Sequence, residues 1–238
     1  MRSAGKILAN TFSHISEFIQ DGMTARQVDL IAQSFIESQN ATPGFLGYRG
    51  YQYSTCISKN EEIVHGIPFE DKLFYDGDIV SIDIGVKFNG YYADAARTFL
   101  IGNVSDEAKF LVDITEQSFF ESMKGISSGS RLGDISNGIQ GYVESHGLTV
   151  VKDLYSHGIG SSLHEDPLIP NYGRKGVGLL LKDGMTFAIE PMVNLGAPGI
   201  ETLDDDWTIV TEDRKWSAHY ENTIMITSDG VEILTLHE

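Results

Sequence analysis

Two aspartates, Asp83 and Asp94, lie in a segment whose pattern would place them side by side. In residues 77–102, two apolar runs flank Asn89-Gly90, a dipeptide typical of the tight turn in a β-hairpin. A two-residue loop there puts both aspartates on one face as diagonal neighbours, roughly 7–8 Å apart at the backbone. Two anions at that distance repel each other unless a proton or a cation lies between them. We therefore predict a cation site on this hairpin.

An internal repeat supplies two more acidic side chains. IQDGMTARQVDLIAQSFIESQ and ISSGSRLGDISNGIQGYVESH align without gaps at an offset of 107 residues. The same offset aligns the first strand of the hairpin with DGMTFAIE, so that Asp83 corresponds to Glu190. In the next strand Asp94 corresponds to Glu221, with additional residues in the second hairpin. A charge in an apolar strand needs a partner, and four such carboxylates suit a pair of hard or borderline divalent ions.

Three histidines stand near these carboxylates in the chain. His157 lies among small residues in YSHGIGSSLHEDP, in an expected loop from which a ring nitrogen could reach a metal. His164 follows seven residues later, too far for the helical i,i+4 pair of a zinc protease. His65 lies in EEIVHGIP, before the first hairpin. Any one of them alone is more typical of a hydrogen-bonded loop residue, and only the set with the carboxylates indicates a metal site.

Composition restricts the class of protein. Seventeen basic against thirty-four acidic residues among 238 give a formal net charge of −17, which argues against a nucleic-acid partner. The single cysteine, Cys56, excludes an internal disulfide and favours a reducing compartment. No run approaches the ~18 apolar residues of a membrane span, and the first residues lack a signal-peptide core. We expect a soluble, cytoplasmic protein that contacts no membrane.

Four amphipathic helices are predicted around the two hairpins. The first covers residues 3–20, and the second begins after Thr24, whose spacing to Gln27 is typical of a capping box. Ser105 caps the third, which ends near residue 124, and the fourth covers about 132–146.

The repeat also predicts the domain organisation. We expect a single α+β domain over residues 1–238, built from duplicated helix-plus-hairpin halves of about 1–104 and 105–238. Residues 41–75 are expected to form loops and short strands, because glycine and proline interrupt them repeatedly.

Five short motifs occur in the order seen in the type I methionine aminopeptidases, and the chain resembles that family over essentially its whole length. They are HGIP at 65–68, the Asp83/Asp94 hairpin, HGIG at 157–160 with His164 following, FAIEPM at 187–192 and HYENT at 219–223. The resemblance implies the pita-bread fold, a pseudo-twofold architecture around a curved, mostly antiparallel sheet. It also implies removal of the initiator methionine from nascent proteins whose second residue is small.

The resemblance further implies a site for two divalent ions. Asp94 and Glu221 would bridge both ions, Asp83 would chelate the second, and His157 with Glu190 would complete the first. Water activated by the two metals would be the nucleophile, and Glu190 could also act as general base. Carboxylates with one histidine are compatible with Co, Mn, Fe or Zn ions.

Contacts to the substrate are implied in the same way. His164 would steady the peptide carbonyl, and His65 would lie near the amine or the scissile nitrogen. A methionine side chain needs an apolar, polarisable pocket. The resemblance places around it Phe45, Tyr48, Tyr51, Cys56, Leu163 and Trp207, although plain core packing is an equal expectation for the aromatic residues.

Four residues depart from the family pattern. Leu163 stands where an aromatic residue commonly precedes the second histidine, and Ser156 stands where glycine is common. Arg49 and Gln52 occupy positions where histidine and proline are frequent. None of the four is a proposed metal ligand, so we expect effects on specificity and rate but not on the reaction.

Three alternatives share the fold. X-Pro aminopeptidases and dipeptidases normally carry an additional N-terminal domain, for which this chain has no room. Type II methionine aminopeptidases carry a long helical insertion, whereas only twenty-five residues separate His164 from Glu190. An inactive binding protein would have lost ligands, and all five candidates are present. The expected partners are N-terminal methionyl peptides and nascent chains, with no nucleic acid, and the default state is a monomer.

Overall fold

The segment with the two aspartates forms the longest ladder in the structure, a computed structural model that describes residues 1–236. Strands β4 (Ile79–Phe88) and β5 (Tyr91–Leu100) pair along their whole lengths. Asn89 and Gly90 have φ angles of 50° and 83°, as a two-residue hairpin turn of this hand requires. Each aspartate pairs with the residue that this turn predicts, Ala96 for Asp83 and Gly85 for Asp94, so the predicted register is confirmed.

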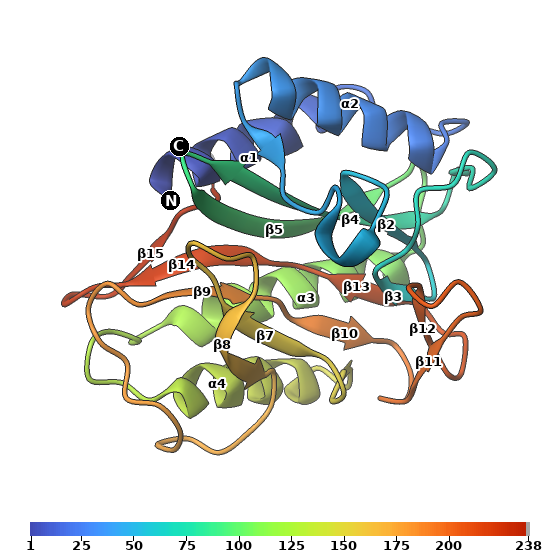
Figure 1. The fold of residues 1–238 in the computed structure, drawn as a ribbon. Helices are drawn as coiled ribbons and strands as arrows, with labels where there is room; N and C mark the ends of the chain where they lie inside the picture. Colours follow the sequence, from blue (N-terminus) through green and yellow to red (C-terminus); the bar gives the residue numbers. More distant parts are fainter. Residues whose placement is uncertain (237–238) are drawn as a thin grey trace.

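The first two helices, α1 (Arg2–Ser16) and α2 (Ala25–Ser38), cover one face of this hairpin (Figure 1). The capping box at the start of α2 is confirmed, because Thr24 and Gln27 exchange both hydrogen bonds. The predicted end of the first helix near residue 20 is wrong. The chain leaves the helix at Ser16, and Ile19 packs against the same core from a turn, which continued the apolar pattern beyond the helix.

The other two helices, α3 (Asp106–Met123) and α4 (Leu132–Ser145), lie on the opposite side of the molecule, next to a second sheet (Figure 1). Ser105 accepts a hydrogen bond from the backbone N–H of Ala108 and thus caps α3, as predicted. The sheet has the order β15-β14-β9-β7-β8. Its strands are β7 (Tyr155–Gly158), β8 (Glu165–Pro170), β9 (Thr186–Ile189), β14 (Asn222–Ile226) and β15 (Val231–Ile233).

Short strands complete the fold around the long hairpin. In the first sheet β4 pairs with β5 and with the shorter β1 (Thr42–Pro43) and β2 (Thr55–Lys59). A one-turn 3₁₀ helix, Tyr48–Gly50, lies between these two short strands in the chain. Two three-stranded sheets contain β6 (Thr149–Val150), β10 (Met192–Asn194) and β13 (Ser217–His219), and β3 (Glu62–Val64), β11 (Ile200–Thr202) and β12 (Ile209–Thr211). Because helices pack on antiparallel ladders throughout the described chain, the α+β class is confirmed.

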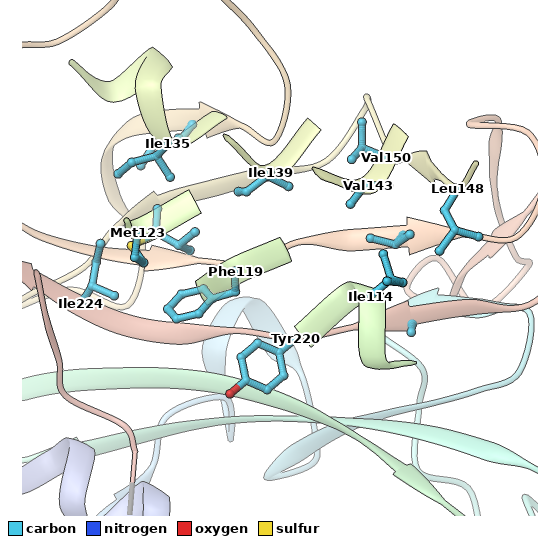
Figure 2. Packing of buried hydrophobic residues seen from close by; sticks show 14 of the residues in the cluster. Ile114, Phe119, Met123, Ile135, Ile139, Val143, Leu148, Val150, Tyr220 and Ile224 are labelled. Carbon is cyan, nitrogen blue, oxygen red and sulfur yellow. The ribbon is translucent and has the colours of Figure 1, made fainter. Parts of the chain in front are cut away.

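Two large hydrophobic clusters form the core. One draws all its buried members from residues 4–101, and the other draws its members from residues 104–226 together with Ile79. Figure 2 shows the second cluster, in which Phe119 and Met123 of α3 and Ile139 of α4 meet between helices and strands. The proposed division into halves stays a prediction, although this partition of the core is compatible with it. Among residues 1–236, the structure has no helix of the length and apolar character that crossing a membrane requires.

A buried carboxylate fixes the start of β2. One carboxylate oxygen of Asp29, on α2, accepts hydrogen bonds from the backbone N–H groups of Ser54 and Thr55, each at 2.9 Å, and from the Thr55 hydroxyl at 2.8 Å. Its second oxygen pairs with the guanidinium of Arg26.

Asp29→Ala should therefore leave two buried N–H groups unpaired. We expect the free energy of unfolding to fall by about 3 kcal/mol, measured by urea denaturation. Glu37→Ala on the exposed face of the same helix is the control and should stay within about 0.5 kcal/mol of the parent. Equal losses in the two variants would contradict this account of Asp29.

Candidate metal centre

Four carboxylates from the two hairpins and one imidazole from β7 meet in one cavity. Asp94 on β5, Glu221 just before β14 and His157 on β7 are each exposed by 3% or less. One possible ligand atom from each of these three lies within 4.8 Å of the others. Asp83 on β4 and Glu190, which follows β9, line the same cavity and are only partly buried. The five residues predicted from the repeat and the resemblance are thus brought together.

His157 faces the carboxylates through one ring nitrogen. Its Nδ1 donates a hydrogen bond to the carbonyl of Gly158 at 2.7 Å, which leaves the lone pair on Nε2. That Nε2 lies 3.9 Å from Asp94 Oδ2 and 3.8 Å from Glu190 Oε1. Burial lowers the pKa of His157, so the neutral ring is favoured. The expectation of a loop at this position is wrong, because β7 holds the residue by pairing with both β8 and β9.

The electrostatics of the cavity favour a bound proton or a bound cation. Burial raises the pKa of Asp83 to about 7. Burial also raises the pKa values of Asp94, Glu190 and Glu221 well above their ordinary range, and the neighbouring carboxylates raise them further. One oxygen of each aspartate has no hydrogen-bond partner in the described part of the chain. Because oxygen ligands with one imidazole are typical for divalent ions, the residues present fit a divalent metal.

A serine and an asparagine hold the backbone of Glu190. The Ser156 hydroxyl accepts the N–H of Glu190 at 2.9 Å and donates to Asn171 Oδ1 at 2.9 Å. Asn171 in turn donates its amide to the carbonyl of Glu190 at 2.8 Å. Ser156, one of the departures from the family pattern, therefore supports a candidate ligand directly. Asn171 was not predicted, because no motif in the sequence links it to residue 190.

Hydrogen bonds join β5, which carries Asp94, to the segment that carries Glu221 directly before β14. The N–H of Glu221 donates to the carbonyl of Ala96 at 3.0 Å. The hydroxyl of Thr223 accepts the N–H of Asp94 at 2.8 Å and donates to the carbonyl of Asp94 at 2.9 Å. The backbone around Asp94 is thus fixed against the backbone around Glu221.

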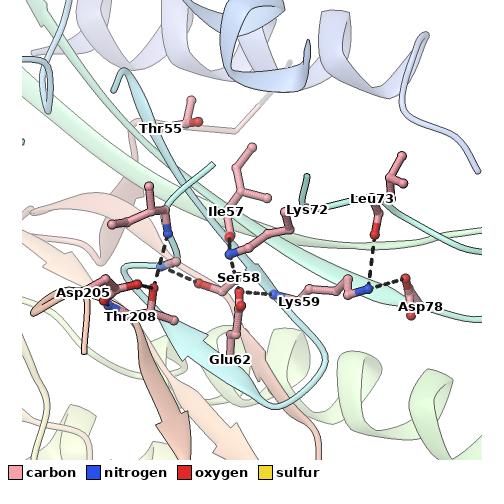
Figure 3. A network of polar contacts seen from close by, with 12 residues as sticks. Thr55, Ile57, Ser58, Lys59, Glu62, Lys72, Leu73, Asp78, Asp205 and Thr208 are labelled. Atoms are coloured by element: carbon pink, nitrogen blue, oxygen red, sulfur yellow. Dashed lines mark hydrogen bonds and ion pairs between the residues drawn. The ribbon is translucent and has the colours of Figure 1, made fainter. Parts of the chain in front are cut away.

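A polar network connects the turn between β2 and β3 with residues 72–78 (Figure 3). Glu62 accepts the N–H of Lys59 at 2.9 Å and the ammonium of Lys72 at 2.7 Å. Lys59 continues the network to Asp78, 3.2 Å away. These contacts fix the ends of the turn between β2 and β3, directly before the loop that carries His65.

Further hydrogen bonds hold two segments that line the cavity, one with His65 and one with Trp207. Next to His65, whose φ is 59°, the N–H of Gly66 donates to the Ser58 hydroxyl at 3.1 Å. The hydroxyl of Thr208 donates to Asp205, which also accepts the N–H of Trp207. The His65 loop and the Trp207 turn are thus both tied down by side-chain hydrogen bonds.

The cavity has a volume of about 190 Å³ and an apolar end. There the rings of Tyr51 and Trp207 lie 4.8 Å apart, and Phe45 packs so closely on β4 that a Cβ at Gly85 would lie 2.7 Å from its ring. All thirteen predicted site residues line this cavity: Phe45, Tyr48, Tyr51, Cys56, His65, Asp83, Asp94, His157, Leu163, His164, Glu190, Trp207 and Glu221.

Sequence reasoning assigned no role to five further residues at the site. Val64, Leu154, Tyr155 and Met192 line the cavity. His219 is 1% exposed, with its Nε2 3.7 Å from Glu190 Oε2. For two of these five residues the sequence held a signal, because Met192 ends the FAIEPM motif and His219 begins HYENT. Among the departures, Arg49 lines the cavity, whereas Gln52 lines a separate surface hollow with Arg26 and Tyr53.

Comparison with known proteins identifies the family. The model of metallopeptidase family M24 matches residues 1–228. A methionine aminopeptidase of Clostridium perfringens is 53% identical over 236 residues, which cover 99% of this chain and 94% of that protein. The chain belongs to metallopeptidase family M24, among the type I methionine aminopeptidases.

Further relatives of this M24 chain agree. Methionine aminopeptidase 1 of Bacillus subtilis is 48% identical over 235 residues, covering 99% of this chain and 94% of that protein. The crystal structure of methionine aminopeptidase from Thermotoga maritima superimposes with a TM-score of 0.98 at 45% identity, covering 100% of this chain and 95% of that one. The predicted pita-bread fold is confirmed by this match.

Glu221→Gln should weaken metal binding and abolish turnover in this M24 chain, because an amide brings no negative charge to the cluster. We expect the affinity for a divalent ion to fall by more than ~100-fold. This exceeds the loss that follows when a residue that only orients a ligand is changed. Metal content after dialysis, measured by elemental analysis, tests this. Glu212→Gln on the exposed surface is the control. Normal metal content and activity in Glu221→Gln would show that the ligand assignment is wrong.

Proposed function

We propose that this protein hydrolyses the peptide bond after an N-terminal methionine, in peptides and nascent chains whose second residue is small. The observation that carries the proposal is one cavity with a five-residue acidic and imidazole cluster at one end and apolar side chains at the other. Relatives named methionine aminopeptidase, at up to 53% identity over nearly the whole chain, support the same activity.

We assign the metal ligands as the resemblance implies. Asp94 and Glu221 would contact two ions, Asp83 would hold one, and His157 with Glu190 would hold the other. When bound, such ions act as Lewis acids that lower the pKa of water and polarise a peptide carbonyl. The donor set is compatible with Fe(II), Mn(II), Co(II) or Zn(II).

Protein side chains would handle the protons. The carboxylate of Glu190 accepts a proton from the attacking water, since it lies at the cluster and remains partly exposed. The hydroxyl of Tyr48 lies 2.9 Å from Nδ1 of His164. A hydroxyl that donates to Nδ1 leaves the ring proton on Nε2, from which His164 can donate to the peptide carbonyl. His65, on its anchored loop, lies at the cavity as a partner for the scissile nitrogen.

The apolar end of the cavity would receive the methionine side chain. Aromatic and sulfur-containing groups pack well against a thioether, and Tyr51, Cys56 and Trp207 line this end. The cavity is small for a ligand site, which favours one side chain. A free α-amine that binds beside the carboxylates would restrict cleavage to the chain terminus.

Assembly and location belong to the same proposal. Every residue assigned here comes from one chain, so a monomer suffices for the reaction. We place the protein in the cytoplasm, where nascent chains arise. An X-Pro peptidase on the same fold, or an inactive binding protein, remains the competing function.

Two measurements distinguish these functions: activity with and without metal, and cleavage of a methionyl peptide compared with an X-Pro peptide. We expect release of methionine from Met-Ala-Ser, loss of that activity in EDTA and its recovery with Mn(II) or Co(II). An X-Pro peptide should remain intact. The free amino acid is measured by chromatography, and metal content by elemental analysis. A fully metallated protein that cleaves neither peptide would rule out the hydrolase.

Leu163→Phe should change substrate affinity more than the chemical step. Leu163 is 2% exposed in the apolar cluster of the cavity and is not an assigned ligand. A larger ring there should shift KM for Met-Ala-Ser several-fold and leave kcat within about 2-fold, because uniform binding changes act on KM. Leu168→Phe, at a residue 63% exposed on β8, is the control and should change neither constant. A change confined to kcat would contradict the pocket assignment.

A further inference from the structure

Arg97 connects three separate parts of the chain next to the metal centre. It lies on β5, three residues after Asp94. Its Nη1 donates to the carbonyls of Ala96 and Glu221. Its Nη2 donates to Asn222 Oδ1 at 2.6 Å and to the carbonyl of Thr235 at 3.1 Å. One guanidinium thus holds β5, the start of β14 and the segment after β15.

The surroundings fix the plane of this guanidinium. Its central carbon lies 4.5 Å from the ring centre of Tyr220 and 5.2 Å from that of Phe12 on α1. The three residues that accept bonds beyond β5, namely Glu221, Asn222 and Thr235, are exposed by 2% or less. The guanidinium is itself partly buried, and its bonds reach acceptors that are shielded from water, where a hydrogen bond is stronger than in bulk water.

Among residues 1–236, the hydrogen-bond acceptors that contact Arg97 are all neutral. No carboxylate oxygen of these residues lies within ion-pair distance of Arg97, in contrast to Arg26, which pairs with the buried Asp29. A partly buried cation without a contacting anion is costly. Within the described part of the chain, the contacts of the side chain are therefore hydrogen bonds to peptide and amide groups. These bonds fix the peptide groups that carry and flank Glu221.

We propose that Arg97 is a positioning residue of the metal centre, whose guanidinium holds the start of β14 against β5 so that the Glu221 carboxylate faces Asp94. The inference rests on the metal centre of the proposed function and not on its peptide substrate. Outer residues that orient ligands typically contribute 10–100-fold to metal affinity. Such orientation depends on the planar fork of arginine, because a lysine ammonium is a single point that cannot span these acceptors.

The test compares metal binding in Arg97→Lys, Arg97→Gln and a matched control, Arg26→Lys. The control also replaces an arginine whose guanidinium contacts a buried group, but its partner Asp29 lies on α2 and is not a candidate ligand. Each metal-free protein is titrated with Mn(II) by calorimetry, and the visible absorption spectrum of its Co(II) form is recorded. Circular dichroism and thermal melting report folding.

We expect both Arg97 variants to bind Mn(II) 10–100-fold more weakly than the parent and to show altered Co(II) bands. Arg26→Lys should melt at a lower temperature and keep the affinity and the spectrum of the parent. Should Arg97→Gln fail to fold, Arg97→Lys decides alone.

Two results would overturn the proposal. In one, both Arg97 variants keep the parent's affinity and spectrum while melting earlier, which would make Arg97 purely structural. In the other, only Arg97→Gln binds Mn(II) more weakly. The effect would then come from the positive charge, which lysine keeps, and not from the hydrogen bonds that position Glu221. A parent protein that binds Mn(II) but releases no methionine from Met-Ala-Ser would remove the proposed function and leave the result on Arg97 standing.

Discussion

The mutual repulsion of buried carboxylates is the constraint on which this structure depends. Four acidic side chains converge in a cavity where solvent screening is weak, and among the described residues only histidines lie within ion-pair distance of them. Folding such a cluster costs free energy that either protons or cations must offset. Hydrogen bonds to the neighbouring peptide groups oppose this repulsion, because they hold the strands that carry the carboxylates in place.

Local chemistry made much of the fold predictable. Asn89-Gly90 determines the register of β4 and β5, and that register alone places Asp83 and Asp94 on one face. The caps at Thr24 and Ser105 each act on a residue three positions away. In these cases the interaction partners are close in sequence, so a pattern of residue types is sufficient to predict the result.

The predictions were wrong or missing where the hydrogen-bond or strand partners are distant in sequence. Arg97 contacts the carbonyl of Glu221 across 124 positions. Asn171 donates directly to the carbonyl of Glu190 and also accepts from Ser156, which only the folded sheet brings near. The strand conformation of His157 likewise follows from pairing with its neighbours, not from its own glycine-rich surroundings. The convergence of the four carboxylates was nevertheless predictable, because the internal repeat aligns their positions without any knowledge of contacts.

The two hairpins present their acids on side chains of different length and from different kinds of backbone. Asp83 and Asp94 are short side chains inside an uninterrupted ladder of ten residue pairs. Glu190 and Glu221 are longer, and each lies where a strand is interrupted, between β9 and β10 and between β13 and β14. Hydrogen bonds fix the backbone on both sides, so any adjustment to the radius of an ion falls to the side chains. The glutamates have one more rotatable bond than the aspartates, and the second side of the centre can therefore adapt without a movement of its strands.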